Sequence, residues 1–248
     1  MQIETISKNR VLQLLVERYN TNEFNVIYDK GLTDYKRFLP NSDDYKKALS
    51  KRLRVHNEIY NALSSNYNQN NLIVKHFYSN DKYVPIWAIF EIISLGQFAN
   101  LINCLETNTR KEISSMMKIN SSFDTQGIFP VKIIFALKSL RNATAHNHTV
   151  FDNRFEDSKI SKTIRKYLEY EFECKNISFS TITDYIILIV FLLKNYGISK
   201  REINKFVLDF QECVDNFRDK IPTSIFNRIM YTDTLGKIDC MKKFIKKS

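Results

Sequence analysis

Very few residues in this chain interrupt helices. Its 248 residues include only five glycines and four prolines, the residue types that most often end helices or shape turns. Apolar residues recur at intervals of three and four, which is the period of an amphipathic helix. There is no strand-like alternation, no internal repeat and no low-complexity segment. The length allows one large domain or two small ones. We expect a single all-α domain over residues 1–248, an up-and-down bundle of long helices with short connections.

Polar start residues followed by apolar spacing place the helices along the chain. Capping boxes at residues 109–112 and 199–202 each predict the start of a helix. Loops are expected at residues 64–71 and 120–129, and a turn at residues 155–159. The most buried helix is expected to contain the apolar run at residues 186–193. We expect helices over residues 3–19, 24–38 (interrupted near Gly31), 41–63, 85–105, 109 onward, 130 onward, 160–174, 180–197, 199–220, 222–230 and 234–245.

The formal net charge of +10 constrains the partners. A strongly basic protein favours polyanions, nucleic acid before a membrane surface. A lysine-rich proteome would give the same charge without such a partner, and this alternative stays open. Apolar residues make up 44% of the chain and charged residues 26%, which is ordinary for a soluble globular protein.

The cysteines and the apolar runs predict the compartment. Cys104, Cys174, Cys213 and Cys240 are scattered without a Cys-x-x-Cys pair, as in reduced cytosolic proteins. No signal-peptide core opens the chain, and the run at residues 186–193 is too short to span a bilayer. We therefore expect a cytoplasmic protein without a membrane partner.

A polar cluster closes the helix expected from residue 130 onward. Arg141, Asn142 and His146 lie within about two helical turns, after an apolar stripe that would bury the opposite face. An arginine holds a phosphate through two parallel hydrogen bonds, and an imidazole, with a reference pKa of about 6.5, exchanges protons near neutrality. This pair suits cleavage of RNA, whose 2′-hydroxyl supplies the nucleophile. Alternatively, Arg141 caps the helix carbonyls and His146 is an ordinary histidine.

Two stretches carry a family resemblance. Arg141-Asn142-Ala-Thr-Ala-His146 is similar to the Arg-Asn-x-x-x-His motif of the HEPN superfamily. The longer string ending in Asn153-Arg154 resembles the Abi-like (abortive infection) branch of that superfamily. Upstream, the segment 84–96 resembles the second motif of the same branch, a Pro-x-Trp helix entry followed by Glu and Ser-x-Gly. The resemblance covers residues 83–155, which it implies to be the motif core, with residues 1–70 as an amino-terminal helical extension.

The resemblance implies an all-α, HEPN-like helical bundle with additional amino- and carboxyl-terminal helices, and a site with no metal and no cofactor. Glu91 and Ser94, three apart on one expected helix, would share a face and orient the Arg141–His146 cluster; a solvated glutamate is the alternative. His146 and His148 are two apart and cannot chelate a metal together on a helix. The implied catalytic residues are Arg141, Asn142 and His146, and the implied supporting residues are Glu91, Ser94, His148, Asn153 and Arg154.

Two functional hypotheses follow, with a third behind them. The first is a metal-independent endoribonuclease of phage defence, of the abortive-infection or toxin type, that acts on RNA as a homodimer. The second is a non-catalytic RNA- or nucleotide-binding helical module that pairs with a toxin, an antitoxin or a structured RNA. The third is a scaffold dimer in which the motif serves packing. Arg141 and His146 are about 140° apart around one helix, and the family resemblance implies that motif helices pair across a two-fold axis.

Overall fold

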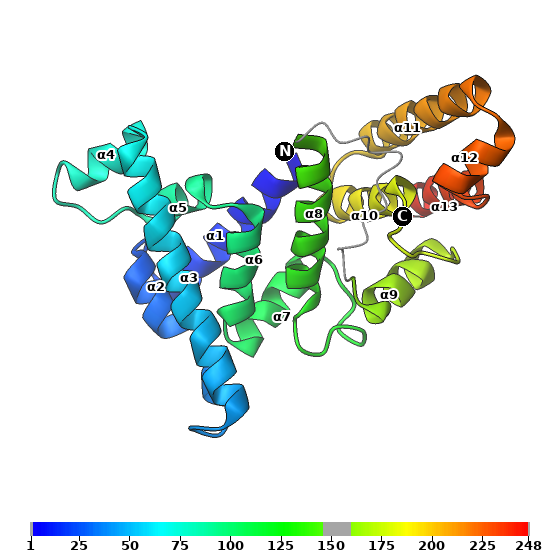
Figure 1. Cartoon of the computed structure of the whole chain (residues 1–248). Helices are drawn as coiled ribbons and strands as arrows, with labels where there is room; N and C mark the ends of the chain where they lie inside the picture. The colour runs from blue at the N-terminus through cyan, green and yellow to red at the C-terminus, as the bar shows by residue number, and fades with distance from the viewer. Residues whose placement is uncertain (1, 146–159, 248) are drawn as a thin grey trace. The chain divides into compact units, whose positions relative to one another are not determined.

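Helices form all the regular secondary structure of the described residues (Figure 1). The computed structural model describes residues 2–145 and 160–247. An isolated bridge between Glu23 and Pro85 is the only extended pairing in these ranges. The predicted all-α fold class is confirmed.

The chain forms two compact units, Met1–Ile134 and Phe135–Ser248. The predicted motif core at residues 83–155 and the extension at residues 1–70 stay predictions. The first unit contains α1 (Gln2–Tyr19), α2 (Phe24–Gly31), the 3₁₀ helix η1 (Asp34–Arg37), α3 (Asp43–Asn68), α4 (Leu72–Tyr78), α5 (Ile86–Ile92), α6 (Leu95–Cys104), α7 (Thr107–Met116) and the start of α8 (Phe129–Ala145). The second contains the end of α8, followed by α9 (Lys162–Phe172), α10 (Ile182–Asn195), α11 (Lys200–Lys220), α12 (Thr223–Met230) and α13 (Thr234–Lys246).

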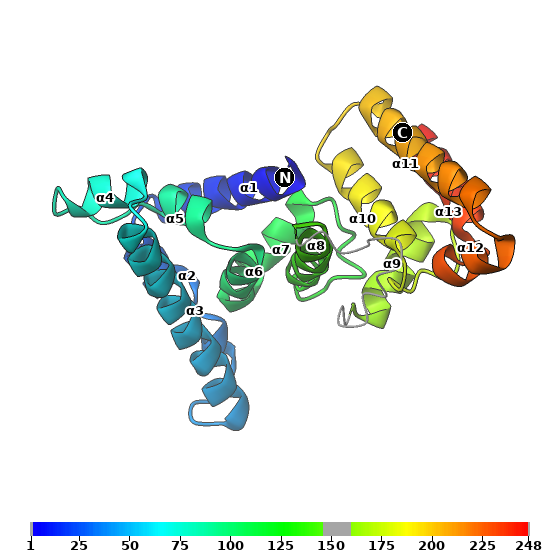
Figure 2. The same cartoon turned by 45° about the horizontal axis from the view of Figure 1, so that its top comes forward.

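The long helix α3 organises the first unit (Figure 2). Elements η1, α4, α5 and α6 contact α3, while α1 contacts α2, α5 and α7. Val55, Ile59 and Leu63 bury one stripe of α3, at the helical spacing that the sequence predicts. Ser42 caps α3 by accepting a hydrogen bond from the Tyr45 amide, as its position before an apolar-periodic segment predicts.

The loop predicted at residues 64–71 was wrong, because most of these residues are helical. Helix α3 continues to Asn68, and Asn71 caps α4, a helix that the sequence analysis did not predict. The asparagines form local hydrogen bonds here: Asn66 donates to the Ala62 carbonyl, and the Asn71 side chain accepts from two amides of α4. Polar side chains that favour loops also cap helices, so composition alone misplaced the break.

The single helix predicted over residues 85–105 was also wrong. It is broken at Ile93, whose ψ of 143° is extended, and Ser94 then caps α6. Ser94 and Gln97 form a capping box, the Ser-x-x-Gln pattern that marks a helix start. The buried ammonium of Lys8 donates to the Ile93 carbonyl at 2.8 Å, which satisfies an acceptor that the break leaves open. Glu91 and Ser94 therefore do not share a helix face.

The predicted capping box at Thr109 was wrong as well. Helix α7 begins two residues earlier, at Thr107, with Glu106 in the cap position. Thr109 lies inside the helix, and its hydroxyl donates to the Glu106 carboxylate at 3.1 Å. The threonine is fully buried, so tertiary packing decides where this helix starts.

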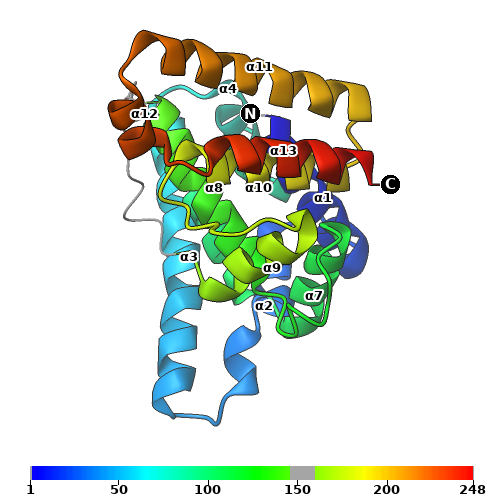
Figure 3. The same ribbon diagram turned by 90° about the vertical axis from the view of Figure 1, so that its right-hand side faces the viewer.

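The second unit is built around α13, which contacts α9, α10 and α11 (Figure 3). Helix α10 buries eleven of its fourteen residues, the most of any helix with described burial along its whole length, which confirms the prediction for residues 186–193. Ser199 and Glu202 form the predicted capping box of α11. Gly197 adopts the predicted left-handed conformation, with φ +84°, and Thr181 rather than Ser180 occupies the cap position of α10.

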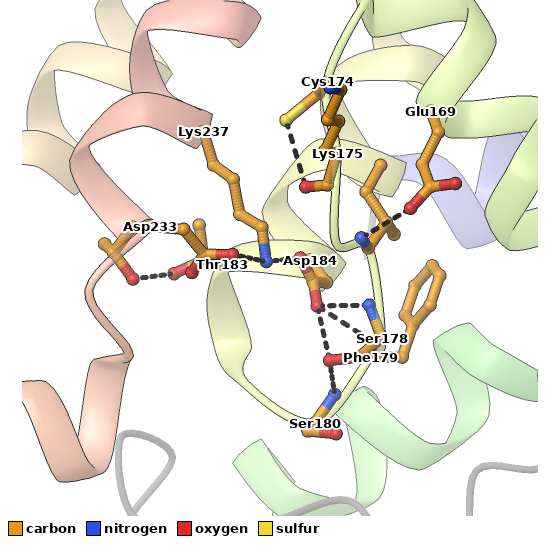
Figure 4. A network of polar contacts seen from close by, with 12 residues as sticks. Glu169, Cys174, Lys175, Ser178, Phe179, Ser180, Thr183, Asp184, Asp233 and Lys237 are labelled. Atoms are coloured by element: carbon orange, nitrogen blue, oxygen red, sulfur yellow. Dashed lines mark hydrogen bonds and ion pairs between the residues drawn. The ribbon is translucent and has the colours of Figure 1, made fainter.

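A buried ion pair joins α10 and α13 in this unit (Figure 4). The Lys237 ammonium lies 2.8 Å from the Asp184 carboxylate and 3.1 Å from that of Asp233. Asp184 also accepts hydrogen bonds from the backbone amides of Ser178 and Phe179 at 3.0 and 2.8 Å. Burial opposes the charged lysine, but the two carboxylates outweigh it and raise the pKa of Lys237. The pair thus fixes the segment that enters α10.

Removing the lysine alone should destabilise the second unit strongly. Lys237→Met leaves the Asp184 charge buried without its cation, at a cost of about 3–5 kcal/mol. The double variant Asp184→Asn, Lys237→Met removes both charges and should recover most of that loss. Urea unfolding followed by circular dichroism measures both. Equal destabilisation of the two variants would show that packing, and not charge, is what the lysine supplies.

Candidate functional site

Arg141 and Asn142 lie near the C-terminal end of α8, as predicted. The helix is anchored by a buried stripe, and this confirms the expected placement of Arg141 and Asn142 on a well-anchored helix. Phe135 and Leu137, two further apolar residues of α8, are only partly buried. Between Phe129 and Thr144, the buried residues of α8 are Phe129, Pro130, Val131, Ile133, Ile134, Ala136, Leu140 and Ala143.

The Arg141 side chain is exposed, and Asn142 is half-buried beside it. Among the residues that the structure describes, no carboxylate forms an ion pair with Arg141. The carbonyls of Leu140 and Arg141 accept from the Thr144 hydroxyl, at 3.2 and 2.9 Å. These bonds lie within the helix and do not involve the Arg141 guanidinium. A solvent-facing guanidinium without a carboxylate is available to bind an anion.

Half-buried Lys138 lies one turn before Arg141 and Asn142 on α8. Residues three and four apart share a helix face, so this face carries two cations and one amide. The arrangement suits a phosphate, with charge from Lys138 and Arg141 and a hydrogen bond from Asn142.

The other half of the predicted cluster lies outside the described residues. His146, His148, Asn153 and Arg154 all fall within residues 146–159, so their predicted roles stay predictions. Among the described residues of this cluster, the structure brings Arg141 and Asn142 together on one helix.

Glu91 and Ser94 belong to the first unit, where the structure separates their roles. Glu91 is exposed on α5. Ser94 accepts the Gln97 amide as the cap of α6, so its hydroxyl has a structural partner. Upstream, Pro85 occupies the cap position of α5, and the Ile86 amide donates to the Asn22 carbonyl at 2.8 Å. The predicted helix entry at residues 84–87 therefore exists, and it is anchored to the segment before α2.

The first unit also contains a basic cleft that no sequence pattern predicted. The cleft has a volume of about 270 Å³ and lies where η1, the first half of α3 and the end of α6 meet. Lys47 and Lys51 are four apart on α3 and line the cleft with Arg37, Arg52 and Arg110. The four-residue spacing of the lysines was visible in the sequence, but the arginines reach the cleft only through tertiary packing.

All four cysteines are free, and two of them are buried. Burial raises the pKa of the Cys104 thiol, which lines the cleft, to about 12. Burial, with the neighbouring Cys240, likewise raises the pKa of Cys174 to about 12. Thiols with such pKa values are protonated at neutral pH and poorly nucleophilic. Cys104 and Cys174 are core residues and not candidate nucleophiles.

No three His, Cys, Asp or Glu side chains gather to hold a metal ion within residues 2–145 and 160–247. Over the same described ranges, no helix is both long and apolar enough to cross a membrane.

Comparison with protein families gives one match. The model of a family described as Abi-like protein matches residues 1–152. This range contains α1 to α8, the basic cleft, the segment 84–96 and the string from Arg141 to His146, and it ends just before Asn153. Comparisons with curated proteins and with solved structures found no match.

The structural role of Ser94 can be tested against a matched cap in the other unit. Ser94→Ala should lower stability by about 1 kcal/mol, the usual cost of a lost N-cap, and Ser199→Ala should cost the same. Ser94→Asn keeps an acceptor and should retain stability. Thermal unfolding measures all three variants. A stable Ser94→Asn protein that has lost activity on RNA would instead assign Ser94 to the site.

Proposed function

The chain belongs to the Abi-like protein family, and we propose that it acts in phage defence by abortive infection, as a metal-independent endoribonuclease. The family membership supports the defence role. The observation that carries the ribonuclease proposal is the exposed Arg141 guanidinium, which meets no carboxylate among the described residues and stands at the end of an anchored helix. The net charge of +10 fits a polyanionic substrate.

In the proposed reaction the substrate supplies the nucleophile. The 2′-hydroxyl oxygen attacks the adjacent phosphorus, the bond to the 5′ oxygen breaks, and a 2′,3′-cyclic phosphate and a 5′-hydroxyl form. His146 either takes the 2′-hydroxyl proton or delivers a proton to the leaving 5′ oxygen, and solvent water exchanges the other proton. Arg141 holds the phosphate and stabilises its developing charge, and Asn142 positions it through an amide hydrogen bond.

The supporting roles rest on the sequence resemblance. Glu91, His148, Asn153 and Arg154 are proposed to orient the catalytic group or the substrate. Ser94 acts through the start of α6, because its hydroxyl already serves as a cap. No cofactor is needed, since neither electrons nor a carried group are transferred.

Substitution of the catalytic pair should abolish cleavage without unfolding the protein. His146→Ala should reduce RNA cleavage by roughly two to four orders of magnitude, the usual contribution of general acid–base catalysis. Arg141→Lys keeps the charge but loses the two-pronged geometry and should also be impaired. Labelled RNA with a single scissile site, incubated with excess chelator, measures the rate.

His76→Ala and Arg54→Ala are matched controls, because both side chains are exposed and lie outside the motif. They should cleave like the parent protein. The products should carry 2′,3′-cyclic or 3′-phosphate ends, and a 2′-O-methyl group at the scissile position should block the reaction. Cleavage that disappears in chelator and returns with magnesium would reject the mechanism, as would full activity in His146→Ala.

The active unit is proposed to be a homodimer with composite sites. On a continuous helix, the five-residue spacing of Arg141 and His146 would place the two side chains about 140° apart. A single phosphate is therefore reached more readily by Arg141 of one chain and His146 of a second chain than by both residues of the same chain. An antitoxin or a regulatory RNA is the further partner that a toxin of this kind would need.

A mixed dimer tests the composite site. An Arg141→Ala chain paired with a His146→Ala chain contains one doubly defective site and one intact site. Mixing the two inactive homodimers under exchange conditions should restore about half of the parental activity per heterodimer. Ultracentrifugation should give about twice the 29.3 kDa chain mass. An isolated, inactive heterodimer would exclude composite sites, and an active monomer would exclude the need for a dimer.

The second candidate is a non-catalytic RNA- or nucleotide-binding module. The cations of α8 favour it too, because they bind a phosphate whether or not a proton is moved. Retention of labelled RNA without cleavage would select this function.

A further inference from the structure

The basic cleft of the first unit has no role in the proposed chemistry. Its wall is the first half of α3, its rim is η1, and residues Asn103 and Cys104 at the end of α6 close it. All of its lining residues lie within Met1–Ile134, and so the cleft is complete inside one unit.

Positive charge exceeds negative charge in this cleft. Five cationic side chains line it with only two carboxylates, Asp34 and Asp44. Asp34 is shared between Arg37 and Arg110, at 2.9 and 2.7 Å. Asp44 lies 4.0 Å from Lys47, and both side chains are largely exposed, where such a pair is weak.

Lys51 increases this excess of positive charge. It is exposed, and it forms no ion pair within the part of the chain that the structure describes. One helical turn separates it from Lys47, so both ammonium groups project from the same face of α3. Two cations on one face, four residues apart, repel each other unless an anion lies between them.

The arginines behind the lysines are held rigidly. Arg110 is 2% exposed and donates to Asp34 and to the Leu105 carbonyl, at 2.7 and 2.6 Å. Arg52 donates to the Asp29 carboxylate at 2.9 Å, and its guanidinium lies 3.9 Å from the centre of the Tyr28 ring. The Arg52 Nε–H is buried without a hydrogen-bond partner, which leaves a donor of the cleft wall unused.

Aromatic rings accompany these cations. Tyr35 and Phe38 line the cleft, with the Arg52 guanidinium 5.5 Å from the Tyr35 ring and the Arg37 guanidinium 4.3 Å from the Phe38 ring. Cations beside aromatic faces are the pairing that proteins use for single-stranded nucleic acids. The volume of about 270 Å³ is just below the usual range for whole small-molecule sites, about 300–1,000 Å³. It suits a phosphate with its sugar better than a large cofactor.

We propose that the η1–α3 cleft is a phosphate-binding site that holds the backbone of RNA. The excess positive charge, the fixed arginines and the neighbouring aromatic rings are the features that identify a phosphate as the ligand. The choice of RNA as its carrier rests on the proposed function. The cleft would then contribute to the affinity for RNA and take no part in the cleavage reaction.

The test removes the two exposed lysines and leaves the structural arginines in place. Lys47→Gln, Lys51→Gln is compared with Lys205→Gln, Lys220→Gln, which neutralises two exposed lysines of α11 and gives the same net charge. Fluorescence anisotropy measures binding to a labelled single-stranded RNA that carries 2′-O-methyl groups throughout. Because this probe cannot be cleaved by 2′-hydroxyl attack, the measurement does not depend on His146.

The cleft variant should bind this RNA about 10-fold more weakly at near-physiological salt. The slope of log affinity against log salt should fall by about 0.7 for each RNA phosphate that the protein no longer neutralises. The α11 variant should bind as the parent does, and both should unfold at the parental temperature. Equal weakening in the two variants, or none in either, would overturn the proposal.

Competition identifies where the phosphate comes from. Displacement of the probe by unlabelled RNA, but not by inorganic phosphate or a 5′-mononucleotide at millimolar concentration, supports the RNA chain as ligand. If a mononucleotide binds the parent protein and the cleft variant does not bind it, while RNA affinity is the same in both, the site is for a free nucleotide and RNA is rejected. If the protein binds RNA through the cleft but does not cleave it, only the ribonuclease proposal is refuted. If the parent protein cleaves RNA and the cleft variant binds RNA as tightly as the parent does, only the cleft proposal is refuted.

Discussion

The first unit depends on one buried cation, Arg110. Its guanidinium donates to Asp34, 76 positions earlier, and to the Asn103 and Leu105 carbonyls at the end of α6, while its Nε reaches the Gln126 carbonyl before α8. These bonds join η1, α6, α7 and the 120–129 loop at one point. Gly127 completes the arrangement: its φ is +64°, and a Cβ there would lie 2.5 Å from the Arg110 backbone. Losing the guanidinium would leave several buried acceptors open, so this charge is needed for the fold.

Most of the helices could be predicted because their signals are local. Spacing of apolar residues marked α1, α3 and α10, and the cap residues Ser42 and Ser199 marked two starts correctly. The errors came where distant groups decide. The break between α5 and α6 carries a Ser-x-x-Gln signal at Ser94, but its open carbonyl is satisfied by Lys8, 85 positions away. The start of α7 depends on the burial of Thr109, which no local pattern shows.

In the candidate site, too, the parts with local sequence signals could be predicted and the parts formed by distant segments could not. The placement of Arg141 and Asn142 near the end of an anchored helix followed from the apolar stripe before them, and the structure confirms it. His146 is known from its position in the motif alone. The basic cleft could not be predicted, because Arg110 and Asp34 reach it from segments far apart in the sequence. The four-residue spacing of Lys47 and Lys51 fits any solvated helix face, and only the neighbouring η1 makes it the wall of a cleft.

Arg110 and Arg141 show why residue type alone does not identify a functional cation. Arg110 is surrounded by hydrogen-bond acceptors, and its charge is used by Asp34 and by backbone carbonyls. Arg141 is exposed, and no carboxylate among the described residues pairs with it. A guanidinium with satisfied partners stabilises the protein, whereas one without them gives up little to bind an outside anion. The same distinction separates Lys237, paired and buried in the second unit, from Lys51, which lines the cleft without a counter-charge among the described residues.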